Sequence, residues 1–332
     1  MAGMTSSISQ ALLAPLSFRP CYQSVVWGGR RMEQWRDDLP EGPIGESWDI
    51  SQQERGMSVV AEGPLSERTL ASLMEEAGAE LVGSVYDGGD FPLLIKLLDA
   101  RQRLSVQVHP DDELAQRFKV GQRGKTECWY IIGDGGELFQ GTKPGMDAEQ
   151  FRVAISSNEV EPCLNRFETT DGEFYFMPAR TLHALGTNTL LYEIQQSCDC
   201  TFRVYDWGRM GLDGKPRQLH IEESLATIDF DGGEVGARPG ETSEHALGGT
   251  VRTLVDCPYF SVEERQASAT GGGDTERCSV VICLSGSGTL KTEGGALTMQ
   301  PMRSYLVPAV AGAWQAKGEG GGDLRLLVAR PN

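Results

Sequence analysis

The sequence predicts a mainly β protein to which helices are added. Short apolar runs recur along its 332 residues, and turns rich in glycine and proline separate them; the chain has 41 glycines and 16 prolines. Short β-like runs between such turns are typical of sandwiches and barrels. The length suffices for two domains or for one large β domain with additions. We expect a larger domain over residues 1–240 and a smaller one over residues 251–332.

Charge and hydropathy exclude several classes of protein. The net charge of −17 argues against a nucleic-acid partner, because basic groups at phosphates dominate such binding. No apolar run approaches the roughly 20 residues that a membrane helix needs. Residues 1–7 lack the features of a secretory signal, so we expect a cytoplasmic protein with its eight cysteines reduced. The oligomeric state is left open.

The hydrophobic period changes along the first hundred residues. Residues 45–51 alternate as a strand does, whereas apolar residues within 64–83 recur at spacings of three and four, which predicts an amphipathic helix. Ser66 is its expected N-cap. Residues 91–99 are apolar on both faces and predict a central strand. Lys96 interrupts this strand, and it either reaches the sheet edge or serves a site.

The later elements follow from the same patterns. Asp147 and Gln150 have the spacing of a capping box and predict helix from 147, with helical structure continuing to about 165. Residues 231–250, with six glycines, are the linker candidate. We further expect helices at 111–118 and 219–228, strands at 127–132, 172–178 and 189–196, and β runs beyond the linker at 259–263, 279–284, 306–308 and 324–328.

Polar side chains gather on two consecutive β runs. Gln107 and His109 are two residues apart and therefore project from one face of a strand, which Pro110 ends. Lys125 and Glu127 share a face in the same way on the next run. Four polar side chains on neighbouring strands are costly in a core, so we interpret them as a site.

The chain has only four histidines, and His183 also ends a β run near a proline. Together with Gln107, His109 and Glu127 it offers two imidazoles, a carboxylate and an amide oxygen. This set suits zinc or another divalent first-row ion, with a position open for water or substrate. The alternative is a group of satisfied polar residues at the mouth of a barrel.

These residues resemble the two cupin motifs. Gln107-x-His109, then Glu127 and Gly133, is similar to the first motif, with glutamine in place of the usual first histidine. The second motif is matched by Gly172, Pro178, His183 and Asn188, the asparagine standing one residue late. Arg180 stands where glycine is usual, and glycine is favoured where φ is positive.

The resemblance is closest to class I mannose-6-phosphate isomerases, in particular the short bacterial form. It covers most of residues 14–230, in order. The segments that carry it include Pro-Leu-Leu-Ile-Lys96, Leu-Ser105-Val-Gln107-Val-His109-Pro-Asp, Gly-Lys125-Thr-Glu127-Cys-Trp-Tyr, Ser-x-Asp199-x-Thr-Phe-Arg203 and Leu-His220-Ile-Glu. It implies a cupin (jelly-roll) β-barrel catalytic domain with helical insertions at about 64–83, 147–165 and 219–228, followed by a smaller cupin-like β domain. The smaller domain has no histidine, so no metal is assigned to it.

The resemblance also implies an activity and its residues. Such an enzyme interconverts mannose 6-phosphate and fructose 6-phosphate through a cis-enediol. The expected cofactor is one divalent metal ion, zinc, and the expected partner is a phosphosugar substrate, with neither nucleic acid nor membrane. Gln107, His109, Glu127 and His183 would hold the metal. The catalytic residues would be Arg203, Lys125 and Asp199, with Lys125 or Asp199 moving the proton. Lys96 and Ser105 would bind the substrate.

Each of these residues also has a structural interpretation. Lys125 could be a solvated lysine, Asp199 could cap a turn, and Arg203 could pair with Asp206 or Glu193. The fold could also serve a different cupin metalloenzyme, or a non-catalytic, regulatory cupin that binds sugar phosphate.

Overall fold

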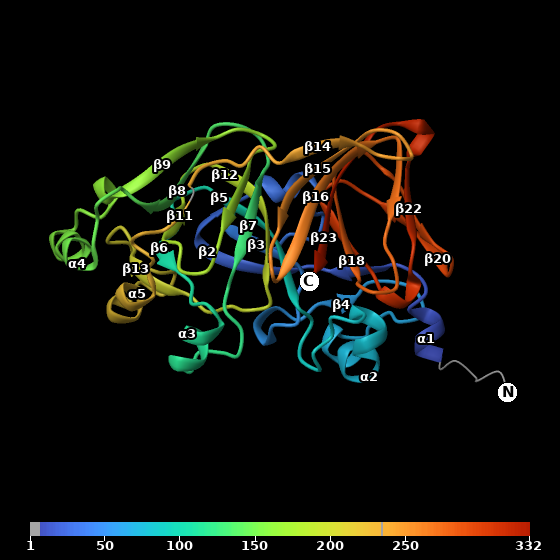
Figure 1. Cartoon of the computed structure of the whole chain (residues 1–332), viewed down its shortest axis with the longest axis horizontal. Coiled ribbons are helices and arrows are strands. Elements are labelled where there is room, and N and C mark those ends of the chain that lie inside the picture. The colour runs from blue at the N-terminus through green and yellow to red at the C-terminus, as the bar shows by residue number, and fades with distance from the viewer. Residues whose placement is uncertain (1–6, 234) are drawn as a thin grey trace. The chain divides into compact units, whose positions relative to one another are not determined.

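The structure, a computed structural model, describes residues 7–233 and 235–332 (Figure 1). Strands account for 41% of it and helices for 18%, which confirms the mainly β prediction. The chain divides into two compact units, Tyr22–Ser47 with Lys96–Arg238, and Met1–Cys21 with Trp48–Ile95 and Pro239–Asn332. We refer to them as the site unit and the C-terminal unit. None of the helices in the part of the chain that the structure describes is long and apolar enough to cross a bilayer.

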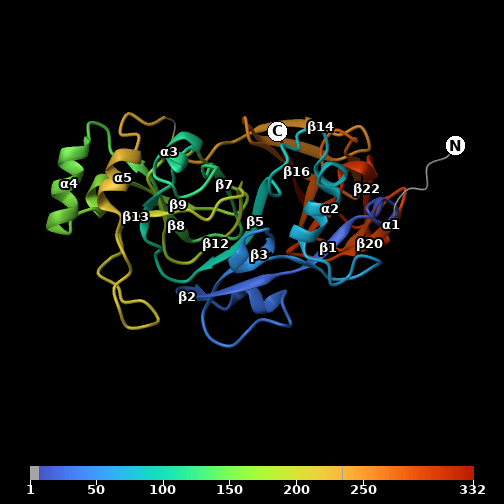
Figure 2. The same ribbon diagram turned by 90° about the horizontal axis from the view of Figure 1, so that it is seen from below.

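Two sheets lie mainly in the site unit (Figure 2). One has the order β10-β7-β12-β5-β2-β3, with β2 (Cys21–Gly29), β3 (Ile44–Ile50), β5 (Leu93–Ala100), β7 (Glu127–Ile131), β10 (Phe174–Met177) and β12 (Thr189–Gln196). The other has the order β13-β6-β11-β8-β9, with β6 (Val106–Val108), β8 (Gly136–Thr142), β9 (Leu164–Thr169), β11 (His183–Leu185) and β13 (Phe202–Tyr205). The helices are α3 (Asp112–Arg117), α4 (Ala148–Ser157) and α5 (Ile221–Thr227), with 3₁₀ turns η1 (Arg31–Gln34) and η3 (Glu161–Cys163).

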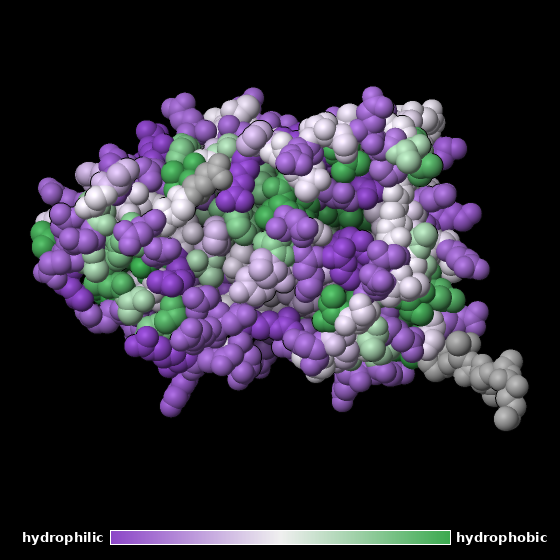
Figure 3. Space-filling model, in the orientation of Figure 1, coloured by the Kyte–Doolittle hydropathy of each residue, from purple (hydrophilic) through white to green (hydrophobic). Residues whose placement is uncertain are grey.

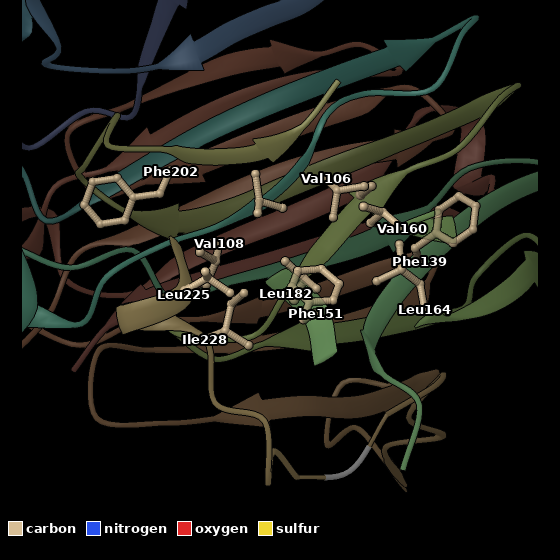
Figure 4. Close-up of a cluster of buried hydrophobic side chains, with 12 residues drawn as sticks. Val106, Val108, Phe139, Phe151, Val160, Leu164, Leu182, Phe202, Leu225 and Ile228 are labelled. Atoms are coloured by element: carbon tan, nitrogen blue, oxygen red, sulfur yellow. The ribbon is translucent and has the colours of Figure 1, made fainter. Parts of the chain in front are cut away.

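The period of two along the short strands decides what faces the helices. Val106, Val108 and Phe202 belong to a buried cluster that includes side chains of α4 and α5 (Figure 4). Alternate strand residues point to opposite faces. Gln107 and Arg203, which lie between these apolar positions, therefore project from the other face of the five-stranded sheet. Burying each large apolar side chain stabilises the fold by about 1.5–3 kcal/mol, so this register is strongly specified.

A second cluster fills part of the space between the two sheets of the site unit. Trp129 and Tyr175 come from the six-stranded sheet, while Leu138 and Leu185 come from the five-stranded sheet. Because these residues lie on the same inner side as the polar positions, the interior of the β structure is apolar in one region and polar in another. The polar region is the candidate site.

The C-terminal unit is a second two-sheet structure, as predicted for the end of the chain. Its larger sheet has the order β14-β15-β16-β23-β18-β21-β1-β4, with β1 (Leu16–Arg19), β4 (Val59–Val60), β14 (Glu241–Glu244), β15 (Thr250–Asp256), β16 (Phe260–Ala267), β18 (Ser279–Ser285), β21 (Arg303–Val307) and β23 (Leu324–Pro331). The smaller sheet consists of β17 (Ala269–Gly272), β22 (Trp314–Gly318), β19 (Gly288–Thr292) and β20 (Gly295–Met299). Trp314 and Leu326 belong to the apolar cluster of this unit.

The unit boundaries differ from the predicted division at 240–251. The C-terminal unit also takes residues 1–21 and 48–95. Strand β1 pairs with β21, and Ser84 N donates to Glu276 O at 2.7 Å. Helix α2 (Leu70–Val82) packs on the 3₁₀ turn η4 (Ala309–Ala311) and is therefore part of the C-terminal unit. Such long-range pairings leave no signal in the local pattern of the sequence.

Two predicted helices are shorter in the structure. Helix α2 begins after Thr69, whose side chain accepts a hydrogen bond from Ser72 N, so the N-cap prediction for Ser66 was wrong. The capping box of Asp147 and Gln150 is confirmed, but α4 ends at Ser157. Asn158 takes the left-handed conformation with φ 62° and terminates the helix. The second part of the predicted helical region, up to 165, is a 3₁₀ turn and the start of β9.

Within the predicted linker, residues 241–244 form strand β14, which pairs with β15. The four residues are all exposed, so no alternation of buried and exposed side chains marked them as a strand. The face of the molecule in Figure 3 is mainly hydrophilic, with separate apolar areas. This surface agrees with the acidic composition of the chain.

Candidate metal centre

Cross-strand register brings the predicted site residues together. Gln107 on β6 lies opposite His183 on β11, and on its other side opposite Arg203 on β13. Side chains directly opposite each other on one sheet face have β-carbons about 4.5–5.5 Å apart. The sheet therefore gathers an amide, an imidazole and a guanidinium at one place.

Three buried side chains form a cluster of metal-ligating type. The ligand atoms of His109, Glu127 and His183 all lie within 4.8 Å of one another. His183 Nε2 is 3.2 Å from Glu127 Oε1, and His109 Nε2 is 3.6 Å from Glu127 Oε2. Two imidazoles around one carboxylate are a donor set that zinc accepts.

Each imidazole is oriented by a backbone carbonyl on the side away from Glu127. His109 Nδ1 lies 2.8 Å from Cys200 O, and His183 Nδ1 lies 2.9 Å from Thr181 O. A proton on Nδ1 satisfies these contacts and leaves the Nε2 lone pair directed toward Glu127. Second-shell hydrogen bonds of this kind fix the tautomer of metal-binding histidines.

Burial keeps both imidazoles neutral at neutral pH. Burial and the charge of Lys125 lower the pKa of His183 to about 4, and burial lowers the pKa of His109 well below its usual value.

Burial and the carboxylate of Glu193 raise the pKa of Glu127. Both Glu127 oxygens are buried, and neither accepts a well-aligned hydrogen bond from the described residues. Lys125 Nζ, 2.9 Å from Glu127 Oε2, compensates part of this buried charge, and a divalent cation would satisfy the remaining lone pairs. The residues therefore fit a metal.

Gln107 belongs to the same group. Its Nε2 lies 3.4 Å from His183 Nε2, and its Oε1 lies 3.5 Å from Ser105 Oγ. Rotation of the amide by 180° exchanges these two atoms and places the oxygen on the side of His183. The structure thus brings together all four residues that the sequence predicted as ligands.

Lys125 touches two members of the cluster. Its Nζ lies 2.9 Å from Glu127 Oε2 and 3.3 Å from His109 Nε2, and the side chain is buried. The alternative of a solvated lysine is therefore wrong. Burial lowers the pKa of Lys125, but the nearby carboxylates of Glu127 and Glu193 outweigh burial, so the net pKa is raised.

A second layer of buried charge was missed by the sequence reasoning. Lys96 Nζ lies 3.1 Å from Glu193 Oε2 and 3.6 Å from Glu46 Oε2. Glu193 is 3% exposed, and its Oε1 lies 3.8 Å from Lys125 Nζ. Lys96 is thus buried and paired, not solvated at a sheet edge. The sequence signal for this ion pair was a carboxylate, Glu193, within the strand predicted at 189–196. In the structure all eight residues of this strand are buried.

Arg203 is held by neutral partners. Its Nε donates to Ser105 Oγ at 3.1 Å, and its Nη1 donates to Gln218 O at 3.0 Å. The Asp206 carboxylate instead accepts hydrogen bonds from Arg209 and Arg217. Burial and the charge of Arg217 lower the pKa of Arg203. An anionic ligand would therefore be favoured beside Arg203, although the chain as a whole is acidic.

Asp199 lies at the rim of the group. It is exposed, and its charge contributes to the raised pKa of Lys125. Its neighbour Cys200 supplies the carbonyl that orients His109.

Arg180, at the position where the motif has glycine, adopts a positive φ of 74°. The turn before His183 therefore keeps the left-handed residue that the motif leads one to expect, without glycine.

The two-sheet fold and the buried His-Glu-His group define a cupin-type protein with a metal-ligand cluster inside its β structure. Residues 16–127 match the family model described as phosphomannose isomerase type I, catalytic domain. A mannose-6-phosphate isomerase of Streptococcus mutans is 34% identical over 322 residues, which are 96% of this chain and 98% of that protein. The chain belongs to the type I phosphomannose isomerase family.

Solved structures agree with this assignment. The crystal structure of the mannose 6-phosphate isomerase from Bacillus subtilis matches with a TM-score of 0.86 and 33% identity, over 95% of this chain and 99% of that one. A more distant mannose 6-phosphate isomerase, with zinc bound, matches with a TM-score of 0.74 at 16% identity, over 96% of this chain and 99% of that one. The second likeness shows the fold alone.

Proposed function

We propose that the chain is a metal-dependent aldose–ketose isomerase that interconverts mannose 6-phosphate and fructose 6-phosphate through a cis-enediol. The observation that carries this proposal is the buried group of His109, Glu127 and His183 with Lys125 Nζ 2.9 Å from Glu127. A ligand cluster and a potential proton carrier in contact are what such a reaction needs. The relatives that bear this name support the choice of substrate.

The metal would be held by Gln107, His109, Glu127 and His183. Zinc is the proposed ion because two imidazoles and a carboxylate suit it, and because the distant relative has it bound. When bound, a divalent cation supplies Lewis acidity to the substrate oxygens, on which negative charge develops during the reaction.

Lys125 is the proposed base. The reaction removes the proton from C2 of mannose 6-phosphate and adds a proton to O1, which forms the enediol. Loss of the O2 proton and return of a proton to C1 then give fructose 6-phosphate. In the neutral amine form, Lys125 can take the first proton and deliver it to the second carbon. The neutral form would require a bound cation that compensates the charge of Glu127. Without it, the Glu127 carboxylate raises the pKa of Lys125 and keeps the lysine protonated. Asp199 is the second candidate for proton transfer at the rim.

Arg203, Ser105 and Lys96 are proposed to receive the anionic substrate. Arg203 and Ser105 already share a hydrogen bond, so they offer a guanidinium and a hydroxyl side by side. Such donors suit phosphate or a developing enediolate oxygen. Lys96 would contribute its positive charge from its buried position between Glu193 and Glu46.

The cytoplasm is the proposed compartment. All eight cysteines are free thiols, which fits a reducing environment.

A coupled assay on mannose 6-phosphate, with metal analysis of the same sample, tests the function. We expect turnover together with about one bound divalent ion per chain. Chelation should abolish exchange of the C2 proton with solvent, and added zinc should restore it. Intact exchange after verified metal removal would refute the mechanism.

A further inference from the structure

The turn at residues 178–182 joins β10 to β11 and leads into His183. Arg180 within it has φ 74°, a conformation that side chains with a β-carbon rarely adopt. Glycine would take this conformation without steric cost. An arginine at such a position is therefore expected to make a contact that glycine cannot.

Arg180 makes three hydrogen bonds with the described residues, and one of them involves its side chain. Its backbone N donates to His109 O at 2.8 Å, and its backbone O accepts from Asp229 N at 3.0 Å. These two bonds would survive any substitution that keeps the backbone in place. The third runs from Arg180 Nε to Thr227 O, at 3.1 Å, and needs the guanidinium.

Thr227 is the last residue of helix α5, and this contact suits a helix end. The final carbonyls of a helix have no intrahelical donors, and they carry a partial negative charge. A guanidinium supplies both a donor and a positive charge there. The side chain of Arg180 therefore attaches the C-terminus of α5 to the turn that carries a metal ligand.

The other end of α5 is attached to Arg203. His220, the N-cap residue of α5, donates from its backbone N to Arg203 O at 2.7 Å, and its Nδ1 accepts from Arg203 N at 3.3 Å. Gln218 O accepts from Arg203 Nη1. The helix thus connects the turn before His183 with the strand residue that faces Ser105.

We propose that Arg180 is a positioning residue, whose side chain clamps the C-terminus of α5 so that the helix holds Arg203 in place beside Ser105. The effect of this clamp on turnover rests on the proposed function, whereas its effect on the helix does not. Among the described residues, the side-chain hydrogen bond of Arg180 goes to Thr227 and not to a metal ligand. Its loss should therefore affect Arg203 and leave metal binding intact.

The variant R180G tests the role of the Arg180 side chain apart from that of its backbone. It keeps both backbone hydrogen bonds, relieves the positive φ and removes the contact to Thr227. We expect unchanged metal content, unchanged or higher thermal stability, faster amide hydrogen exchange in residues 221–227, and roughly tenfold lower kcat/KM, a size typical of coupling through packed elements. R180K, which keeps a donor and the charge, should recover part of the loss.

K119G is the matched control. Lys119 also has a positive φ, of 58°, is exposed, and makes no side-chain hydrogen bond among the described residues. It should gain the same relief of backbone strain without any change in kcat/KM or in exchange of α5.

Three results would overturn the clamp: unchanged exchange of α5 in R180G, unchanged kcat/KM in an active parent, or loss of metal together with activity. If the parent has no isomerase activity, the exchange measurement still decides the clamp. In that case the proposed function fails while faster exchange in R180G supports the clamp.

Discussion

Lys125 Nζ lies 2.9 Å from Glu127 Oε2, and both side chains are almost completely buried. The first residue of β7 is therefore a candidate metal ligand, and the candidate base lies two residues before it. At this distance the charge of the Glu127 carboxylate controls whether the Lys125 amine is protonated. Substitutions that remove the amine and those that remove the carboxylate should consequently have different signatures.

Replacing Lys125 by methionine should abolish proton transfer and keep the metal. We expect kcat to fall by about 10²–10⁴, the usual contribution of a positioned acid–base group. Turnover of mannose 6-phosphate and metal content would be measured on the same sample. K143M, at an exposed lysine of the site unit, is the control and should retain the parent rate. A K125M enzyme with near-parent kcat would exclude the lysine as the base.

Replacing His183 by asparagine should reduce bound metal. Zinc in excess stabilises a folded protein that binds it by RT ln(1 + [L]/Kd), about 2.7 kcal/mol at a concentration of 100 Kd. We expect the shift in melting temperature on adding zinc to disappear in H183N. H245N removes a histidine from the C-terminal unit and should keep the shift. A zinc shift that survives in H183N but not in H245N would reverse the assignment.

Breaking the buried pair of Lys96 and Glu193 should destabilise the fold. In E193Q, Lys96 and Lys125 lose a buried counter-charge, and removing one partner of such a pair costs about 3–5 kcal/mol. Urea denaturation would measure this loss. The double variant K96M/E193Q removes one of the uncompensated charges as well and should be more stable than E193Q. A double variant that is less stable than the single one would argue against a direct pair.

Glu137 should stabilise the fold near neutral pH and lose this effect in acid. Burial opposes its charge, but hydrogen bonds from Arg103, Thr187 and Arg166 outweigh burial and lower its pKa from 4.5 to about 2. The folded state thus binds the proton more weakly than the unfolded state. The stabilisation is fully present above about pH 4.5 and is lost as the pH falls toward 2.

The variant E137Q tests this prediction by equilibrium unfolding between pH 3 and pH 7. It should be less stable than the parent by about 1–3 kcal/mol at pH 7, with a smaller difference near pH 3. E168Q is the control, since Glu168 lies opposite Glu137 in the pairing of β8 with β9 but is exposed. A difference between E137Q and parent that grows in acid would contradict the sign of the pKa shift.

Much of the fold could be read from local pattern. The strand expected at 189–196 is β12 to the residue, and the capping box at Asp147 predicted the start of α4. Errors arose where tertiary context decided. Asn158 ended α4 through a left-handed conformation, and β14 formed from four exposed residues because β15 offered a partner edge.

The candidate ligands were predicted because their residue types are rare in a core and their spacing is local. Gln107 and His109, and likewise Lys125 and Glu127, are two apart, and the period of a strand puts each pair on one side. His183 was singled out as one of four histidines, at the end of a β run near a proline, and the resemblance to the second cupin motif supported it. The distances among these residues depend on strand register, which the sequence does not display.

By itself, the sequence determined a mainly β chain, a set of candidate metal ligands, and a neighbouring lysine, because each depends on residue type and short spacing. Only the tertiary structure decided that Glu193 and Glu46 lie beside Lys96, that Asp206 pairs with Arg209 and Arg217, and that Arg180 reaches α5. These contacts join residues distant along the chain. They form because packing of sheets and helices selects one register among many, and no local preference of the chain encodes that selection.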